Sequence, residues 1–284
     1  MDKGPYTNRE DGSGLRRLKY LSRESFTRAQ LNKLRTGTLK QTFGEIEVGE
    51  ERKLHIGCAT ITPPGWINLD GSWNAGLAQH LFIRRVLKLL RVVPVDKSTI
   101  QWSKDILIHD VRKGLPFCDN YLNAVYSSHL LEHLYCEEAK SLLRECLRTL
   151  KPGGIIRLVV PDLCSIVFKY IQERQSKPEA QDDKELSPAD RLCQRLGMRP
   201  QAPPQGNLLY RFYTTIKEFH SHKWMYDKES LVRRLLEVSF INVSGMSFLE
   251  SEIPGIEEVE RKDRFENSIV CVEGIKSLEM SCAS

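Results

Sequence analysis

The stretch HDVRKGLPFCDNYLNAVYSSHLLEHLYCEEAKSLLRECLRTLKPGGIIRLVVPDL, residues 109–163, decides the fold. Within it, residues 122–127 read as a strand, and residues 137–150 place apolar side chains on one helical face. Residues 151–154, Lys-Pro-Gly-Gly, end that helix, and residues 155–160 form the apolar run of a strand buried on both faces. This order of elements predicts part of a mostly parallel sheet in an α/β fold.

The alternation continues on both sides of this stretch. Before it, residues 25–34 and residues 80–93 have the apolar spacing of helices, and residues 80–93 have a basic face opposite the apolar face. Such a basic helix could lie on a membrane surface, but packing on its own domain is the favoured interpretation. The further elements that we predict are helices at 25–34, 80–93 and 227–237, and strands at 52–57, 66–70, 105–109, 240–243 and 268–272.

A polar segment rich in Pro and Gln, residues 175–207, interrupts the pattern. We interpret it as the centre of a lid-like insertion at about 165–226, before the last two strands. The predicted organisation is then a basic extension at 1–48, one catalytic domain at 49–275 and a tail at 276–284.

The positive charge of the chain is concentrated near its start. The 284 residues carry a net charge of +5, and the first 44 hold ten Lys or Arg against four Asp or Glu. The remaining body is close to neutral, which argues against a broad nucleic-acid footprint. The basic extension could make a weak peripheral contact with anionic lipid or an acidic partner, although a solvated arm is the favoured interpretation.

Composition also predicts where the protein resides. No apolar run reaches the roughly 18 residues of a membrane span, and the first residues lack the apolar stretch of a signal peptide. The eight cysteines are scattered without a CxxC pair, as expected for reduced thiols in the cytoplasm. The sequence says nothing of the oligomeric state.

Candidate ligand-binding residues follow four of the predicted strands. Parallel sheets bind ligands outside the carboxyl ends of their strands. Glycine at 57 allows a close backbone approach, Asp70 could accept hydrogen bonds from ribose hydroxyls, and Asp110 could accept from an adenine amine. Ser128 and His129 face the expected reaction space. Each aspartate could instead merely cap a turn.

Together these segments resemble class I methyltransferases that depend on S-adenosylmethionine (SAM), in particular a bacterial group of the methyltransferase type 11 kind. The likeness covers roughly residues 50–275. The motifs that carry it are the Gly-Cys loop at 57–58, PGWINLD at 64–70, LPF at 115–117, HxLEH at 129–133, LKPGG…VPD at 150–162, HKWMYD at 222–227 and IPGI at 253–256.

The resemblance implies a Rossmann-like sheet of seven strands with helices on both faces and the last strand antiparallel, and it implies SAM as the cofactor. It implies that the Gly57 loop lines the methionine part, that Asp70 holds the ribose and that Asp110 with Val111 holds the adenine. Ser128 and His129 would close the sulfonium side. The full implied set is His55, Ile56, Gly57, Cys58, Ala59, Asp70, Gly71, Asp110, Val111, Ser128 and His129.

The Gly57 loop departs from the usual pattern of this family. His55 stands where an acidic residue is usual, and Ala59 stands where a further glycine is usual. The turn at 62–65 also replaces the usual helix after the loop. These departures raise a second hypothesis, a non-catalytic binding module with a degenerate methyltransferase fold. A nicotinamide dehydrogenase is disfavoured because GxGxxG is missing after the first strand.

Transfer to a hydroxyl calls for a general base, and histidines are the candidates. His129 is preferred because it follows the fourth strand directly; His133, His220 and His222 are alternatives. We expect the acceptor to be a small sugar-like or secondary-metabolite molecule, acidic or glycan-like. Its wall is predicted to comprise Tyr210, Arg211, Tyr213, Trp224 and Tyr226.

A metal-dependent reading remains as an alternative. His129, Glu132 and His133 have a spacing that puts them on one helical face, and His220 or His222 could complete a metal site. Some RNA 2′-O-methyltransferases use a comparable set of side chains. Non-metal relatives carry the same LEH motif, so we expect no resident metal.

Overall fold

The computed structural model describes residues 51–72, 75–76, 80, 102–176, 186–198, 221–265 and 268–281. The whole of the predicted extension at 1–48 lies outside the described residues. The predicted helix at 25–34 and all but His80 of the predicted helix at 80–93 also lie outside them.

A seven-stranded sheet with the order β3-β2-β1-β4-β5-β7-β6 forms the centre of the fold. Strands β3, β2, β1, β4 and β5 are parallel, whereas β7 is antiparallel to both β5 and β6. This is the predicted Rossmann-like α/β architecture. The strands are β1 (Lys53–Ile56), β2 (Trp66–Asp70), β3 (Leu107–Ile108), β4 (Leu122–Ser128), β5 (Leu150–Pro161), β6 (Phe240–Gly245) and β7 (Ile269–Lys276).

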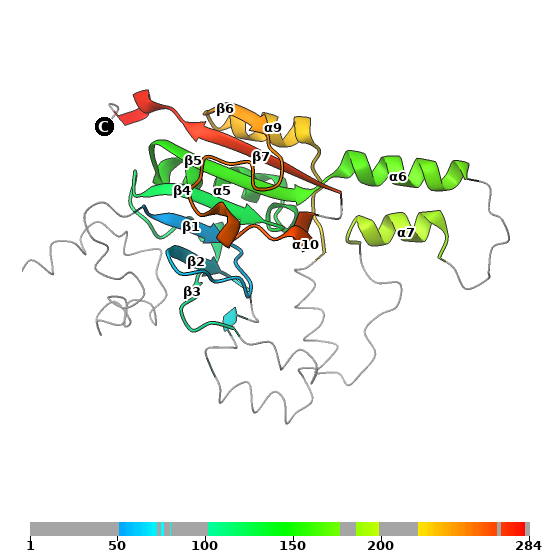
Figure 1. Cartoon of the computed structure of the whole chain (residues 1–284), viewed down its shortest axis with the longest axis horizontal. Coiled ribbons are helices and arrows are strands. Elements are labelled where there is room, and N and C mark those ends of the chain that lie inside the picture. The colour runs from blue at the N-terminus through cyan, green and yellow to red at the C-terminus, as the bar shows by residue number, and fades with distance from the viewer. Residues whose placement is uncertain are drawn as a thin grey trace, which may run out of the picture.

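Helices α5 and α9 cover one face of this sheet, where the larger apolar core lies, and the short helix α10 lies on the other face (Figure 1). Helix α5 begins after Tyr135, whose backbone N–H is accepted by Glu138 in a capping box, and it buries the apolar face seen in the sequence. The helices are α5 (Cys136–Thr149), α6 (Leu163–Gln175), α7 (Pro188–Arg195), α9 (Lys228–Glu237) and α10 (Lys262–Phe265), with 3₁₀ turns η4 (Val111–Lys113), η5 (Leu131–His133), η7 (Ile256–Glu258) and η8 (Leu278–Ser281).

The connection between β1 and β2 contains no helix. Residues 57–65 turn directly back, and the backbone N–H groups of Gly57 and Cys58 both donate to the Leu69 carbonyl, at 2.8 and 3.2 Å. A parallel connection usually needs a dozen or more residues. Residues 57–65 alone return the chain from the carboxyl end of β1 to the start of β2, and the turn at 62–65 stands where the sequence predicts the loss of the usual helix.

The segment that joins β6 to β7 covers the second face of the sheet. In Figure 1 this orange connection crosses the front of the strands, while α5 lies behind them. Trp66 donates its indole N–H to Glu258 at 2.9 Å, and Lys53 donates to the Pro254 carbonyl at 2.7 Å. Ile253, Ile256 and Val259 pack into the smaller core on this side. The segment thus occupies the face that a helix between β1 and β2 would otherwise cover.

Helices α6 and α7 lie side by side and project beyond the sheet (Figure 1). Glu173 on α6 joins them through ion pairs with Arg191 and Arg195 of α7, at 3.2 and 2.5 Å. Both helices fall within the insertion predicted at about 165–226. None of the helices in the described ranges is long and apolar enough to span a bilayer.

Candidate functional site

The loop after β1 brings backbone groups to the carboxyl edge of the sheet. Gly57 has a φ of +71°, a left-handed conformation that side chains disfavour, and a Cβ there would lie 3.4 Å from Leu130. Ala59 also has a positive φ of 49° although it is not glycine. The loop therefore keeps the backbone shape expected of a glycine-rich loop, with one alanine held in a conformation that costs energy.

Asp70 ties this loop to the end of β2. Its side chain is buried, and its two oxygens accept the N–H groups of Ala59 and Ser72 at 2.9 and 2.7 Å. An ionised carboxylate has about four acceptor positions, so about two remain for a ligand. Gly71 is required next to it, because a Cβ there would lie 2.6 Å from the His109 carbonyl oxygen. A ribose with two adjacent hydroxyls fits the acceptor positions that remain.

Asp110, at the end of β3, is engaged differently. It caps η4, and its two oxygens accept the Nε and a terminal N–H of Arg112 at 2.9 Å each. The hydrogen bond from Arg112 holds the pKa of this carboxyl below its usual value. Asp110 therefore caps the turn, which is the alternative that the sequence left open. The predicted contact with an adenine amine would require Asp110 to share its carboxylate with Arg112. Val111 is buried in the core.

His55 and its neighbours form the floor of the loop. His55 is buried between Tyr126 and Trp66, with ring centroids 5.3 and 6.3 Å away, and burial lowers its pKa to about 4. It is therefore neutral and cannot replace the charge of the usual acidic residue. Ile56 is fully buried, and burial raises the pKa of the Cys58 thiol, so Cys58 is no nucleophile.

Ser128 and His129 lie at the end of β4, beside the Gly57 loop. His129 has a φ of +54°, and its backbone N–H donates to the Val159 carbonyl at 2.9 Å. Its ring lies between two acceptors: Nδ1 is 3.3 Å from a Glu132 oxygen and Nε2 is 3.4 Å from the Arg264 carbonyl oxygen. Both ring nitrogens of His129 thus face oxygen atoms that can only accept hydrogen bonds from them.

Two groups around His129 were not identified as its partners from the sequence. The sequence indicates Glu132 only as a metal ligand and gives no sign that Arg264 lies near the site. Glu132 is fully buried in η5, while Arg264 belongs to α10 on the segment that crosses the second face. No pattern in the sequence places residue 264 next to residue 129, because the contact depends on the path of a long connection.

The predicted catalytic histidines are brought together in part. His133 and His222 face each other with ring centroids 5.1 Å apart, and Glu132 lies beside them. His222 precedes α9, and Lys223 donates its backbone N–H to the Glu132 carbonyl at 2.7 Å. His220 lies outside the described residues.

Of the residues predicted to form the acceptor wall, the structure describes only Trp224 and Tyr226. Tyr210, Arg211 and Tyr213 lie outside the described residues. Trp224 is 46% exposed and available to a ligand, whereas Tyr226 is 1% exposed and packs in the main core. This burial argues against a place for Tyr226 in an exposed wall, because its ring packs in the main apolar core.

The strained backbone at Ala59 gives a testable prediction for stability. The left-handed conformation costs a residue with a Cβ about 1–2 kcal/mol, and glycine at this position would avoid that cost. Glycine also loses more conformational entropy on folding, which offsets about 0.5–1 kcal/mol of this gain. We expect Ala59→Gly to raise the free energy of unfolding by up to about 1 kcal/mol in urea denaturation. Ala139→Gly in α5 is the control and should lower it by about 1 kcal/mol. A loss of stability in Ala59→Gly would show that the loop is not strained.

A comparison with known families matches part of this chain. The family described as "Methyltransferase domain" matches residues 79–158. That range holds β3, β4, α5 and most of β5, and it leaves the Gly57 loop and Asp70 outside. No curated protein matches the chain.

Solved structures of methyltransferases also match along most of the chain. A SAM-dependent methyltransferase of Archaeoglobus fulgidus is 15% identical, with 88% of this chain and 100% of that one covered and a TM-score of 0.38. A SAM-dependent methyltransferase of Thermotoga maritima is 16% identical, with 88% and 97% covered and a TM-score of 0.37. These likenesses concern the fold alone. The family match concerns residues 79–158 alone, and the strand order is that of a Rossmann-like seven-stranded sheet.

Proposed function

We propose that this chain transfers the methyl group of SAM to a hydroxyl oxygen of a small sugar-like or secondary-metabolite acceptor. One observation carries the proposal. Asp70 lies at the end of β2 with two acceptor positions to spare, bonded to the backbone of the loop that follows β1. Ligands of parallel sheets bind at this edge, next to the β1–β4 junction where the strand order reverses.

The chain's own residues would divide the work of binding. Asp70 would accept the two ribose hydroxyls, and Gly57 leaves room for the methionine part at the end of β1. When bound, SAM supplies a methyl group that is already electrophilic on its sulfonium. The protein then has to align the acceptor oxygen with that methyl, which can contribute up to about 7–11 kcal/mol to lowering the barrier.

His129 is the proposed general base. Glu132 would accept the Nδ1 proton and fix the ring, so that Nε2 takes the proton of the acceptor hydroxyl. The Arg264 carbonyl oxygen lies 3.4 Å from Nε2 and would have to leave this position for the acceptor hydroxyl, because both approach the same face of that nitrogen.

Fewer described residues support the proposed acceptor than support the proposed SAM site. Trp224 offers a half-exposed aromatic surface on the loop that also carries His222. Aromatic faces of this kind suit the apolar faces of sugar rings and planar metabolites. A cytoplasmic location, with no nucleic-acid partner, belongs to the same proposal and follows from the scattered cysteines and the near-neutral body.

A non-catalytic binding module is the second candidate function. It is favoured by the Asp110 carboxylate, which is already held by Arg112 on both oxygens, and by the neutral His55 in place of an acidic residue. Both features would weaken the grip on SAM without altering the fold.

The test is turnover of methyl-labelled SAM against a panel of sugars, sugar phosphates and phenolic metabolites. We expect label transfer to at least one hydroxyl acceptor, and a loss of about 10²–10⁴-fold in His129→Asn, because asparagine tolerates the left-handed backbone but cannot act as a base. SAM binding by His129→Asn should remain within about threefold of the unsubstituted chain. Transfer without any loss in His129→Asn would remove the base role, and SAM binding without any transfer would favour the binding module.

A further inference from the structure

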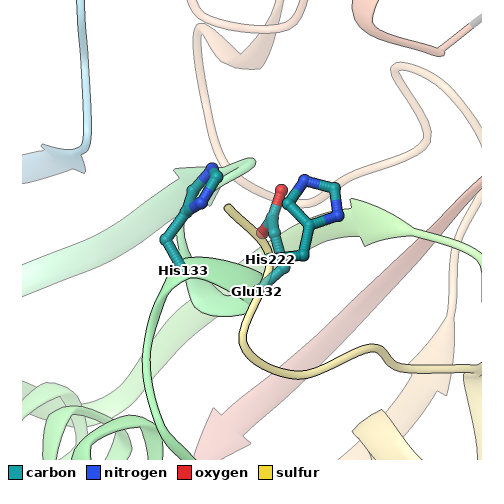
Figure 2. Close-up of side chains that lie close together, drawn as sticks. All are labelled: Glu132, His133 and His222. Atoms are coloured by element: carbon teal, nitrogen blue, oxygen red, sulfur yellow. The ribbon is translucent and has the colours of Figure 1, made fainter. Parts of the chain in front are cut away.

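Three donor side chains gather at the carboxyl end of β4. Glu132 and His133 come from η5, and His222 comes from the loop before α9, as Figure 2 shows. Each offers one ligand atom, and these atoms all lie within 4.8 Å of one another. Ligand atoms bound to one Zn²⁺ at about 2.0–2.1 Å lie about 3.3 Å apart, so modest side-chain rotations would close the set around an ion.

Among the described residues, none makes a hydrogen bond to the Glu132 carboxylate. Its side chain is 1% exposed, and neither oxygen accepts a hydrogen bond within the part of the chain that is described. The nearby Nδ1 of His129, at 3.3 Å, faces one oxygen and leaves the other free. A buried carboxylate without compensation is strongly unfavourable, and a bound cation is one of the few groups that resolve it.

The backbone holds the donors in place independently of any ion. Lys223 and Trp224 both donate their N–H groups to the Glu132 carbonyl, at 2.7 and 3.3 Å. The N–H of His222 donates to the Gly197 carbonyl at 3.2 Å. Gly197 also makes room for the ring, because a Cβ there would lie 2.5 Å from the His222 imidazole. The positions of the donors thus follow from the fold.

We propose that Glu132, His133 and His222 bind one Zn²⁺ ion. Two imidazole nitrogens and one carboxylate oxygen suit a first-row divalent metal, whereas Mg²⁺ and Ca²⁺ prefer oxygen ligands alone. Three protein ligands leave one position open, which is the arrangement of zinc sites that bind a further molecule. The site differs from the sequence alternative, since His129 supports Glu132 from the side and His133 and His222 supply the nitrogens. It goes beyond the proposed function and shares Glu132 with it: one carboxylate oxygen faces His129, and the other is free for the ion.

The test is a zinc titration of the full-length, chelator-treated protein against a chromophoric chelator, without SAM. We expect one tight equivalent of Zn²⁺ and no competition by millimolar Mg²⁺. His222→Ala and Glu132→Gln should each weaken zinc binding by at least about tenfold, because loss of a supporting residue alone costs 10–100-fold. His80→Ala, which removes an exposed histidine, should leave it unchanged.

Two further measurements keep the result interpretable. Circular dichroism melts of each variant establish that it is folded, and Co²⁺ substitution should give the visible absorption of a four-coordinate site that is lost in His222→Ala. The proposal is overturned if the folded protein binds no stoichiometric Zn²⁺. It is equally overturned if His222→Ala binds as tightly as the unsubstituted chain, since the exposed thiols of Cys164 and Cys193 would then account for the metal.

Discussion

Replacing Arg157 by methionine is expected to lower the free energy of unfolding by about 3–5 kcal/mol. Arg157 is fully buried on β5 and donates to Glu260 at 2.5 Å and to Glu273 at 2.9 Å. It also donates to the carbonyl groups of Glu250 and Ser247, at 2.7 and 2.8 Å. Without the guanidinium, two buried carboxylates lose their counter-charge and the segment from β6 to β7 loses its anchor.

The measurement is urea denaturation of Arg157→Met beside Arg233→Ala. Arg233 makes an ion pair with Glu237 at 3.1 Å, but its side chain is 80% exposed, so its loss should cost at most about 1 kcal/mol. Adding Glu260→Gln to Arg157→Met should recover part of the loss, because the two residues are in direct contact. Equal stability of Arg157→Met and Arg233→Ala would contradict the anchoring role.

Replacing Asp70 by alanine should weaken SAM binding by roughly 100-fold. Two charge-assisted hydrogen bonds to ribose hydroxyls would be lost, at about 1.5 kcal/mol or more each, and 1.4 kcal/mol corresponds to a factor of ten. The loop would also loosen, since Ala59 and Ser72 would lose the acceptor for their N–H groups. Calorimetric titration with SAM measures the change.

Two control variants separate ligand contact from folding. Asp70→Asn keeps one side-chain oxygen, so we expect an intermediate loss of about tenfold. Asp105→Ala removes an exposed carboxylate near the start of β3 and should bind SAM as the unsubstituted chain does. Unchanged binding in Asp70→Ala would place the ribose elsewhere and would end the proposed role of β2.

The repeating parts of the fold were predictable because local pattern and burial agree there. Strand β2 has the predicted bounds 66–70, and α5 and α9 lie within one residue of theirs. Strand β5 begins earlier than expected, at Leu150, because Leu150 pairs with Leu122 of β4 and the pairing resumes at Ile155 after a register shift. Strand β3 is shorter than expected, since only Leu107 and Ile108 pair with β2.

The site was predictable where strand ends alone define it. Gly57 directly follows β1, Asp70 is the last residue of β2, and His129 directly follows β4. A parallel sheet brings such residues to one edge. The contacts of Arg264 and Arg157 were not predictable, because they depend on how the β6–β7 segment crosses the sheet. Likewise, burial of Tyr226 depends on the packing of α9, which an aromatic residue beside a polar insertion does not reveal.

The most direct test of the central claim is calorimetric titration of the purified full-length chain with SAM and with S-adenosylhomocysteine. The proposed function predicts one binding site per chain with micromolar affinity for both compounds. Absence of heat and of competition at millimolar SAM, by protein with a cooperative unfolding transition, would contradict it. The Gly57 loop and Asp70 would then stabilise a methyltransferase fold that has no cofactor.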